Sequence, residues 1–156
     1  MCSILFNRRQ RKAVLKNLSG PVQPDYRRLD SMLRMPNGCF EQTSSTTYPN
    51  LLILDYMKKT KQITPETQFK AEGFVNTGYQ RLVSFESRTP GGWTWFGGHE
   101  AANLMLSAYG LMEFYDMDKV YEIDQDIISR TQDYILSQKK RDGSFQPEGN
   151  LHTGGL

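Results

Sequence analysis

The clearest hydrophobic pattern in the sequence lies between residues 64 and 87. Apolar positions recur there at steps of three and four residues, which is the spacing of one face of an α-helix. Thr64 suits the N-cap of this helix and Pro65 suits its first helical position. The inward stripe is expected to consist of Ala71, Phe74, Val75, Gly78, Leu82 and Phe85. Glycine lowers helix propensity, so Gly73 and Gly78 predict close approach of a neighbouring helix.

Two further segments have helical patterns of different kinds. Residues 101–117 are apolar almost all round, which is typical of a helix enclosed by others. Residues 119–140 are mostly polar and acidic around a narrow apolar stripe, which indicates a helix on the outside of the fold. This stripe is formed by Ile123, Ile127, Thr131 and Ile135. We expect the outer helix to end in a basic last turn that includes Lys139 and Lys140, with Gly143 as the stop.

Two similar loops accompany these helical patterns. Residues 90–98, PGGWTWFGG, and residues 141–149, RDGSFQPEG, each combine a glycine turn with aromatic residues and further glycine. Their spacing is about the length of one helical hairpin with its connections. Strand signals are faint and limited to a short extended piece in GWTWF. The pattern predicts an all-α fold of stacked hairpins, in which inner helices alternate with outer helices around a common axis.

Length and charge narrow the classes of protein. The chain has 156 residues, of which 38% are hydrophobic, enough for one domain with a real core. No apolar run approaches the roughly 18 residues of a membrane span, and the start of the chain lacks the pattern of a secretory signal. Five of the 19 basic residues fall in residues 1–20, which leaves 14 basic against 17 acidic residues in the rest. We expect a basic leader over 1–20, a domain over 21–156, and no nucleic-acid partner, because phosphate binding needs a basic face on the folded body.

The two cysteines, Cys2 and Cys39, are too few for a disulfide framework. With two histidines in the chain they also give no convincing zinc site. We therefore expect neither a metal nor another cofactor.

Candidate chemistry is concentrated at Cys39, which precedes Gln42 by three residues in NGCFEQ. If a helix begins near Glu41, both side chains lie in its first turn on the same side. The thiolate could then attack the carboxamide carbon and expel ammonia, which would leave an internal thioester and make the Gln42 side chain an acyl donor. Gly38 suits the close turn this needs. The alternative is that Cys39 is a small buried hydrophobe and Gln42 an ordinary surface residue.

The amino-acid sequence around this motif resembles the thioester-containing domain of the alpha-2-macroglobulin and complement family, in its bacterial branch. GCFEQ is similar to the Gly-Cys-x-Glu-Gln motif of that family. Other blocks occur in the matching order: LDSMLRMPNGCFEQTSSTTYPNLLILDYMKKT, NTGYQRLVSFES, GGWTWFGG, SAYGLMEFYDM and RDGSFQPEG. The resemblance implies an α/α toroid of helical hairpins and a reactive pair at Cys39 and Gln42. It also implies a single-turnover trap rather than an enzyme, in which the activated parent protein acylates an amine or hydroxyl of a target protease.

The same resemblance assigns a role to His152. Some family members carry a histidine after an Asp-Gly-x-Phe loop, and DGSFQPEGNLH places His152 at that position. In those members the imidazole attacks the thioester first, and the acyl group then passes to hydroxyls or water. Members with another residue there favour amines. The alternative is that His152 is an exposed loop histidine. No role is expected for His99, the other histidine of the chain.

Two features depart from the family pattern. Vertebrate members have glycine where this chain has Phe40, and the toroid needs about twice as many hairpins as the chain supplies. We therefore expect about the first half of a toroid, with inner-helix surface exposed around residues 51–54 and 104–112. Such surface predicts contact with the remaining domains of a larger parent protein, or a homodimer. Candidates for the shield of the thioester are Met35, Phe40, Tyr48, Trp93 and Trp95, although core packing is the better account for most of them.

Other classes stay open at this point. One is a toroid enzyme similar to prenyltransferases or terpene cyclases, for which Asp124 and Asp126 give poor support. A second is a Cys–His thiol hydrolase built on Cys39 and His152, and a third is a structural remnant without a closed thioester. The family resemblance alone implies a location in the periplasm or extracellular space.

Overall fold

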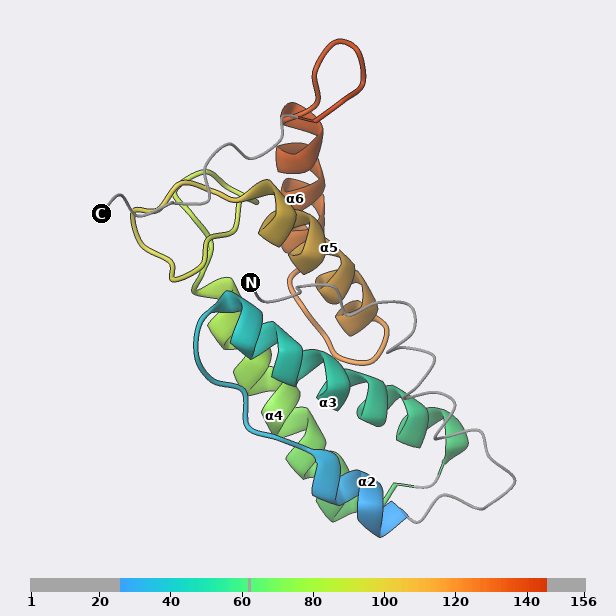
Figure 1. The fold of residues 1–156 in the computed structure, drawn as a ribbon. Helices are drawn as coiled ribbons and strands as arrows, with labels where there is room; N and C mark the ends of the chain where they lie inside the picture. The colour runs from blue at the N-terminus through green and yellow to red at the C-terminus, as the bar shows by residue number, and fades with distance from the viewer. Residues whose placement is uncertain (1–25, 62, 146–156) are drawn as a thin grey trace.

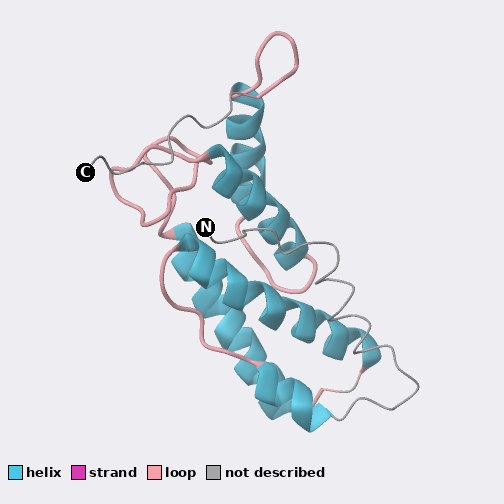
Figure 2. Cartoon of the chain, viewed as in Figure 1, coloured by secondary structure: helices cyan, strands magenta, loops and turns pink. Residues whose placement is uncertain are grey.

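The structure is a computed structural model that describes residues 26–61 and 63–145. Its helices are connected by loops (Figures 1 and 2), and the described ranges contain no named strand, only isolated β-bridges. The helices are α2 (Tyr26–Met32), α3 (Phe40–Thr60), α4 (Pro65–Val83), α5 (Leu104–Asp118) and α6 (Gln125–Ser137). The all-α prediction is therefore confirmed. No helix in these ranges has the length and apolar character needed to cross a membrane.

The helices pair into hairpins in chain order. Helix α3 packs along α4, α5 packs on α6, and α3 also contacts α5 (Figure 1). The long segment between Val83 and Leu104 links the two hairpins and carries Trp93, which is fully buried. The predicted partial toroid of stacked hairpins is the arrangement observed.

Helix α4 begins as the sequence predicted. The Thr64 hydroxyl caps the helix by accepting from the backbone N–H of Thr67 at 3.2 Å, and Pro65 is the first helical residue. Gly78 lies against α3, since a Cβ there would come within 2.1 Å of Thr47 Oγ1. Gly73 does not fit the prediction, because nothing lies within 4 Å of its Cβ position.

The prediction for the end of α6 is wrong. The helix ends at Ser137, so its last turn contains no basic residue. The chain then turns back on itself, with the Lys140 N–H donating to the Ser144 carbonyl at 2.8 Å and Gly143 at φ +86°. Gly143 therefore provides the left-handed residue of this turn and does not terminate α6.

The exposed inner surface is smaller than expected. Leu51, Ile53 and Leu54 are buried at 1% exposure or less, and both α4 and α5 pack against α3, which corrects the prediction for residues 51–54. Helix α5 is not enclosed all round, since Met105 and Tyr115 are each 58% exposed.

Candidate functional site

Cys39 and Gln42 lie together at the start of α3. Cys39 is the N-cap residue, in extended conformation, and Gln42 is the third residue of the helix. The two form a capping box: the Cys39 backbone N–H donates to Gln42 Oε1 at 3.1 Å, while the Cys39 side chain faces the Gln42 N–H. Cys39 is half-buried and Gln42 is exposed. The structure therefore brings this predicted pair into one turn, with the helix starting one residue before the predicted Glu41.

Gly38 shapes this turn in two ways. Its φ of +84° belongs to the left-handed region, which side chains disfavour. A Cβ at this position would also lie 2.0 Å from Gln42 Oε1 and 2.8 Å from Gln42 Cδ. The carboxamide of Gln42 therefore folds back directly over Gly38, and only glycine fits beneath it.

Other parts of the chain hold the turn in place. Arg81, in the last turn of α4, donates from Nη2 to the Gly38 carbonyl at 2.7 Å. The Phe40 N–H donates to the Trp95 carbonyl at 2.9 Å. The Thr43 hydroxyl lies 3.3 Å from the carbonyls of Asn37 and Gly38. The turn is thus fixed from α4, from the inter-hairpin loop and from α3 itself.

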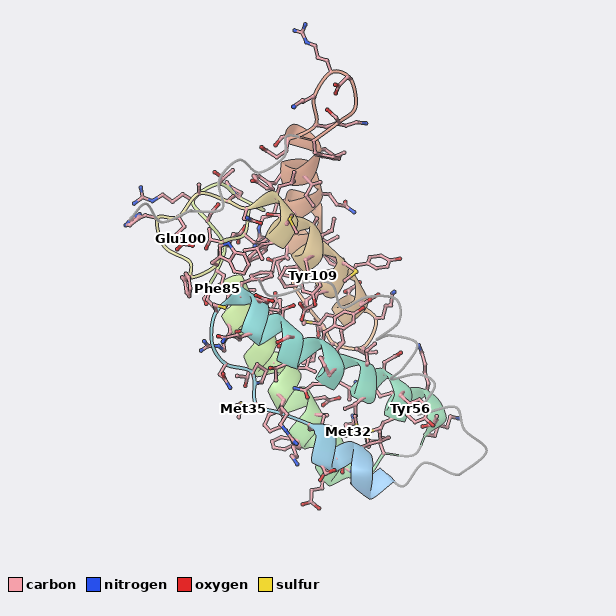
Figure 3. All side chains as sticks on the ribbon, in the orientation of Figure 1. Met32, Met35, Tyr56, Phe85, Glu100 and Tyr109 are labelled. Atoms are coloured by element: carbon pink, nitrogen blue, oxygen red, sulfur yellow. The ribbon has the colours of Figure 1, made fainter. Side chains whose placement is uncertain are left out.

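Most of the expected shield residues belong to the core. Phe40 is fully buried and packs edge-on against Phe85, with ring centroids 6.1 Å apart. Tyr48 and Trp93 are also buried at 1% or less, whereas Met35 is 54% exposed on the segment that leads from α2 to the Cys39 turn (Figure 3). The bulky side chain between Cys39 and Glu41 is accommodated because it points into the core.

The hydroxyl residues after Gln42 serve the helix. Ser45 and Thr46 each donate to the Gln42 carbonyl at 3.0 Å, and Thr47 donates to the Thr43 carbonyl at 2.8 Å. These bonds are typical of serine and threonine side chains that bond the backbone carbonyl of the preceding helical turn.

Glu113 of α5, which the sequence patterns did not single out, is fully buried. One carboxyl oxygen accepts from the Ser44 hydroxyl on α3, and Oε1 has no hydrogen-bond partner among the described residues. Burial raises the pKa of Glu113 to about 8, while the Ser44 hydrogen bond opposes this shift. The signal was present in the sequence, because Glu113 is the single charge inside the apolar run from Leu104 to Tyr115.

The remaining candidate residues are His152, His99 and the acidic pair of Asp124 and Asp126. His152 lies outside the described residues, and His99 is exposed in the loop before α5. Asp124 caps α6 by accepting from the Asp126 N–H at 3.0 Å, a structural task for this acidic pair. Within residues 26–61 and 63–145 no three His, Cys, Asp or Glu side chains are grouped to hold a metal ion.

The stacked hairpins and the Cys-x-x-Gln turn are the features expected of a thioester-containing domain, and comparison with known proteins identifies the family. Residues 12–155 match the family model of the A-macroglobulin TED domain. This match covers most of the chain, so the chain belongs to the alpha-macroglobulin TED-domain family.

Solved bacterial structures share the fold. The chain is 22% identical to Salmonella alpha-2-macroglobulin reacted with methylamine, with a TM-score of 0.57 over 82% of this chain and 8% of that one. It is similar to the same degree, 22% and 0.57, to native Escherichia coli alpha-2-macroglobulin from domain MG7 to the C-terminus, over 79% of this chain and 19% of that one. The chain thus spans less than a fifth of the length of these relatives.

Proposed function

We propose that the chain is the covalent capture module of an alpha-2-macroglobulin-like protease inhibitor. The observation that carries the proposal is the capping box at the start of α3, which holds the Cys39 thiol and the Gln42 carboxamide in one turn over Gly38. Membership of the TED-domain family supports it. The division into a leader over 1–20 and a domain over 21–156 stays a prediction.

The chemistry has two steps. In the first, the Cys39 thiolate attacks Gln42 Cδ, the C–N bond breaks, and Nε2 leaves as ammonia with the thiol proton. In the second, an amine or hydroxyl of the target attacks the same carbon, the C–S bond breaks, and Cys39 is released as a thiol. The target stays attached to Gln42 through an amide or ester, so the module reacts once and is not an enzyme.

His152 is proposed to direct the second step. A neutral imidazole can attack the thioester to give an acyl-imidazole, from which the acyl group passes to a hydroxyl. The preference for hydroxyls over amines therefore depends on this residue.

The partners proposed for this module are a target protease or another surface nucleophile and the remaining domains of a larger parent protein. The exposed Met105 and Tyr115 of α5 support a further association surface, and a homodimer stays a prediction. By analogy with the bacterial relatives, the module would act in the periplasm or extracellular space.

Intact mass before and after methylamine tests the proposal. The Salmonella relative was crystallised after reaction with this amine, which makes it a suitable small nucleophile. A live thioester gives a starting mass below that of the sequence by one ammonia, then a gain of one methylamine and a new thiol at Cys39. An unshifted mass with Cys39 already open to alkylation would instead mean a structural fragment.

A further inference from the structure

One peptide unit connects Arg81 to the acyl group of Gln42. The carbonyl of Gly38 accepts from Arg81 Nη2 at 2.7 Å, and the N–H of the same peptide, which belongs to Cys39, donates to Gln42 Oε1 at 3.1 Å. A continuous hydrogen-bond chain therefore runs from the guanidinium through the Gly38–Cys39 peptide to the carbonyl that would form the thioester.

The surroundings of Arg81 leave its charge directed at this peptide. No carboxylate of the described residues forms an ion pair with Arg81, and its Nε is buried without a hydrogen-bond partner there. The residue is 43 positions away from Gly38 and reaches it from the C-terminal turn of α4. Among the described residues, the contact with the Gly38 carbonyl is the one hydrogen bond of the Arg81 side chain.

A cation on the oxygen of a peptide changes what the nitrogen can do. A charge-assisted hydrogen bond draws electron density from the carbonyl, which makes the N–H of the same peptide a stronger donor. A strong donor on Gln42 Oε1 stabilises the negative charge that this oxygen gains when a nucleophile attacks Cδ. Backbone N–H groups that stabilise acyl-transfer intermediates work in the same way.

We propose that Arg81 is a positioning residue that activates the Gln42 acyl carbon through the Gly38–Cys39 peptide. The inference rests on the proposed thioester function and adds a device to it. As the amine attacks Cδ, the electron pair of the C=O bond moves to Oε1, which is held by the Cys39 N–H. The pair then returns, the C–S bond breaks, and the proton of the amine goes to the Cys39 thiolate.

Three variants of the 156-residue chain test this role: Arg81→Met, Arg81→Lys and the control Arg88→Met. Arg88 is exposed just beyond α4, so its replacement removes the same charge without touching the turn.

The readouts are the rate of methylamine incorporation by the closed fraction, the amide proton shift of Cys39 in NMR spectra, and the midpoint of thermal unfolding. Arg81→Met should slow methylamine at least about tenfold, which is about 1.4 kcal/mol of barrier, and move the Cys39 amide proton upfield. Arg81→Lys should fall between wild type and Arg81→Met, and Arg88→Met should match wild type.

The outcomes distinguish failure of the proposed Arg81 role from failure of the proposed capture function. Unchanged methylamine rate and Cys39 shift in Arg81→Met would overturn the role of Arg81, as would a lower unfolding midpoint with the shift intact, which indicates stability alone. If Arg81→Met does not fold, the Arg81→Lys comparison decides. If wild type shows no loss of ammonia, the capture function falls, and the Cys39 shift in the open chains still decides whether Arg81 polarises the peptide.

Discussion

Gly38 is the residue on which the Cys39–Gln42 turn depends most directly, because the left-handed backbone and the contact with the Gln42 carboxamide coincide there. We expect Gly38→Ala to abolish thioester closure. The left-handed conformation costs alanine about 1–2 kcal/mol, and its Cβ would occupy the space of Gln42 Oε1 and Cδ. Intact mass should show no loss of ammonia.

Gly98→Ala is the matched control for Gly38→Ala. Gly98 also has a positive φ, +74°, but nothing lies within 4 Å of its Cβ position. The control carries the backbone strain without the steric block, so it should lose stability and keep the thioester. Equal loss of closure in both variants would show that strain, rather than the space beneath Gln42, is decisive.

Glu113 predicts an unusual dependence of stability on pH. Because its pKa is raised to about 8 in the folded chain, the folded state keeps a proton that the unfolded state loses above its ordinary pKa of 4.5. The contribution is complete below about pH 4.5 and is lost as the pH rises toward about 8, at up to about 1.4 kcal/mol per pH unit. Denaturant unfolding at intervals from pH 5 to pH 8 measures this slope.

Glu113→Gln should remove most of that slope and raise stability at pH 8. Glutamine keeps a carbonyl oxygen for the Ser44 hydroxyl and cannot ionise. Glu66→Gln, in the exposed first turn of α4, changes the same charge without burial and should retain the wild-type slope. The assignment fails if the Glu113 variant keeps the full slope.

At the scale of elements, two glycines of α4 have opposite surroundings. Gly78 lies beneath Thr47 of α3, while Gly73 is exposed with open space at its Cβ position. We expect Gly78→Ala to destabilise the chain by about 1–3 kcal/mol because α3 and α4 must move apart. Gly73→Ala should stabilise it by about 0.5–1 kcal/mol through helix propensity. Denaturation midpoints of the two variants check both signs, and a stabilising Gly78→Ala would contradict the close packing of α3 on α4.

The start of α4 could be predicted from sequence because its signals are local: Thr64 and Pro65 act within one turn. The position of Cys39 and Gln42 could be predicted for the same reason. The end of α6 could not be predicted from sequence. The turn closed by the hydrogen bond between Lys140 and Ser144 competes with extension of the helix, and the apolar spacing that includes Ile135 contains no signal of this turn. Glu113 and Arg81 were missed since their roles depend on contacts with residues 69 and 43 positions away.

At the scale of the whole molecule, Trp93 joins the two hairpins. Its indole N–H donates to Thr131 Oγ1 of α6 at 3.2 Å, and its ring lies 5.0 Å from that of Phe114 on α5 and 6.3 Å from that of Phe40 on α3. Because Phe40 follows Cys39 directly, the core around Trp93 also supports the reactive turn. Stability of the hairpin pair and geometry of the site are therefore coupled through one side chain.

This coupling predicts that Trp93→Phe lowers both stability and thioester content. The smaller ring leaves a void and removes the hydrogen bond to Thr131, which together should cost about 1–3 kcal/mol. With Phe40 less firmly packed, the turn at Cys39 samples open geometries, and a smaller fraction of molecules should show the loss of ammonia in intact mass. Trp95→Phe is the control, because Trp95 is only half-buried and contacts the turn through its backbone carbonyl, which the substitution retains. Denaturant unfolding and intact mass on both variants decide: a destabilised Trp93→Phe chain with full thioester content would mean that the hydrogen bonds of Arg81, Thr43 and the Trp95 carbonyl hold the site without the core around Trp93.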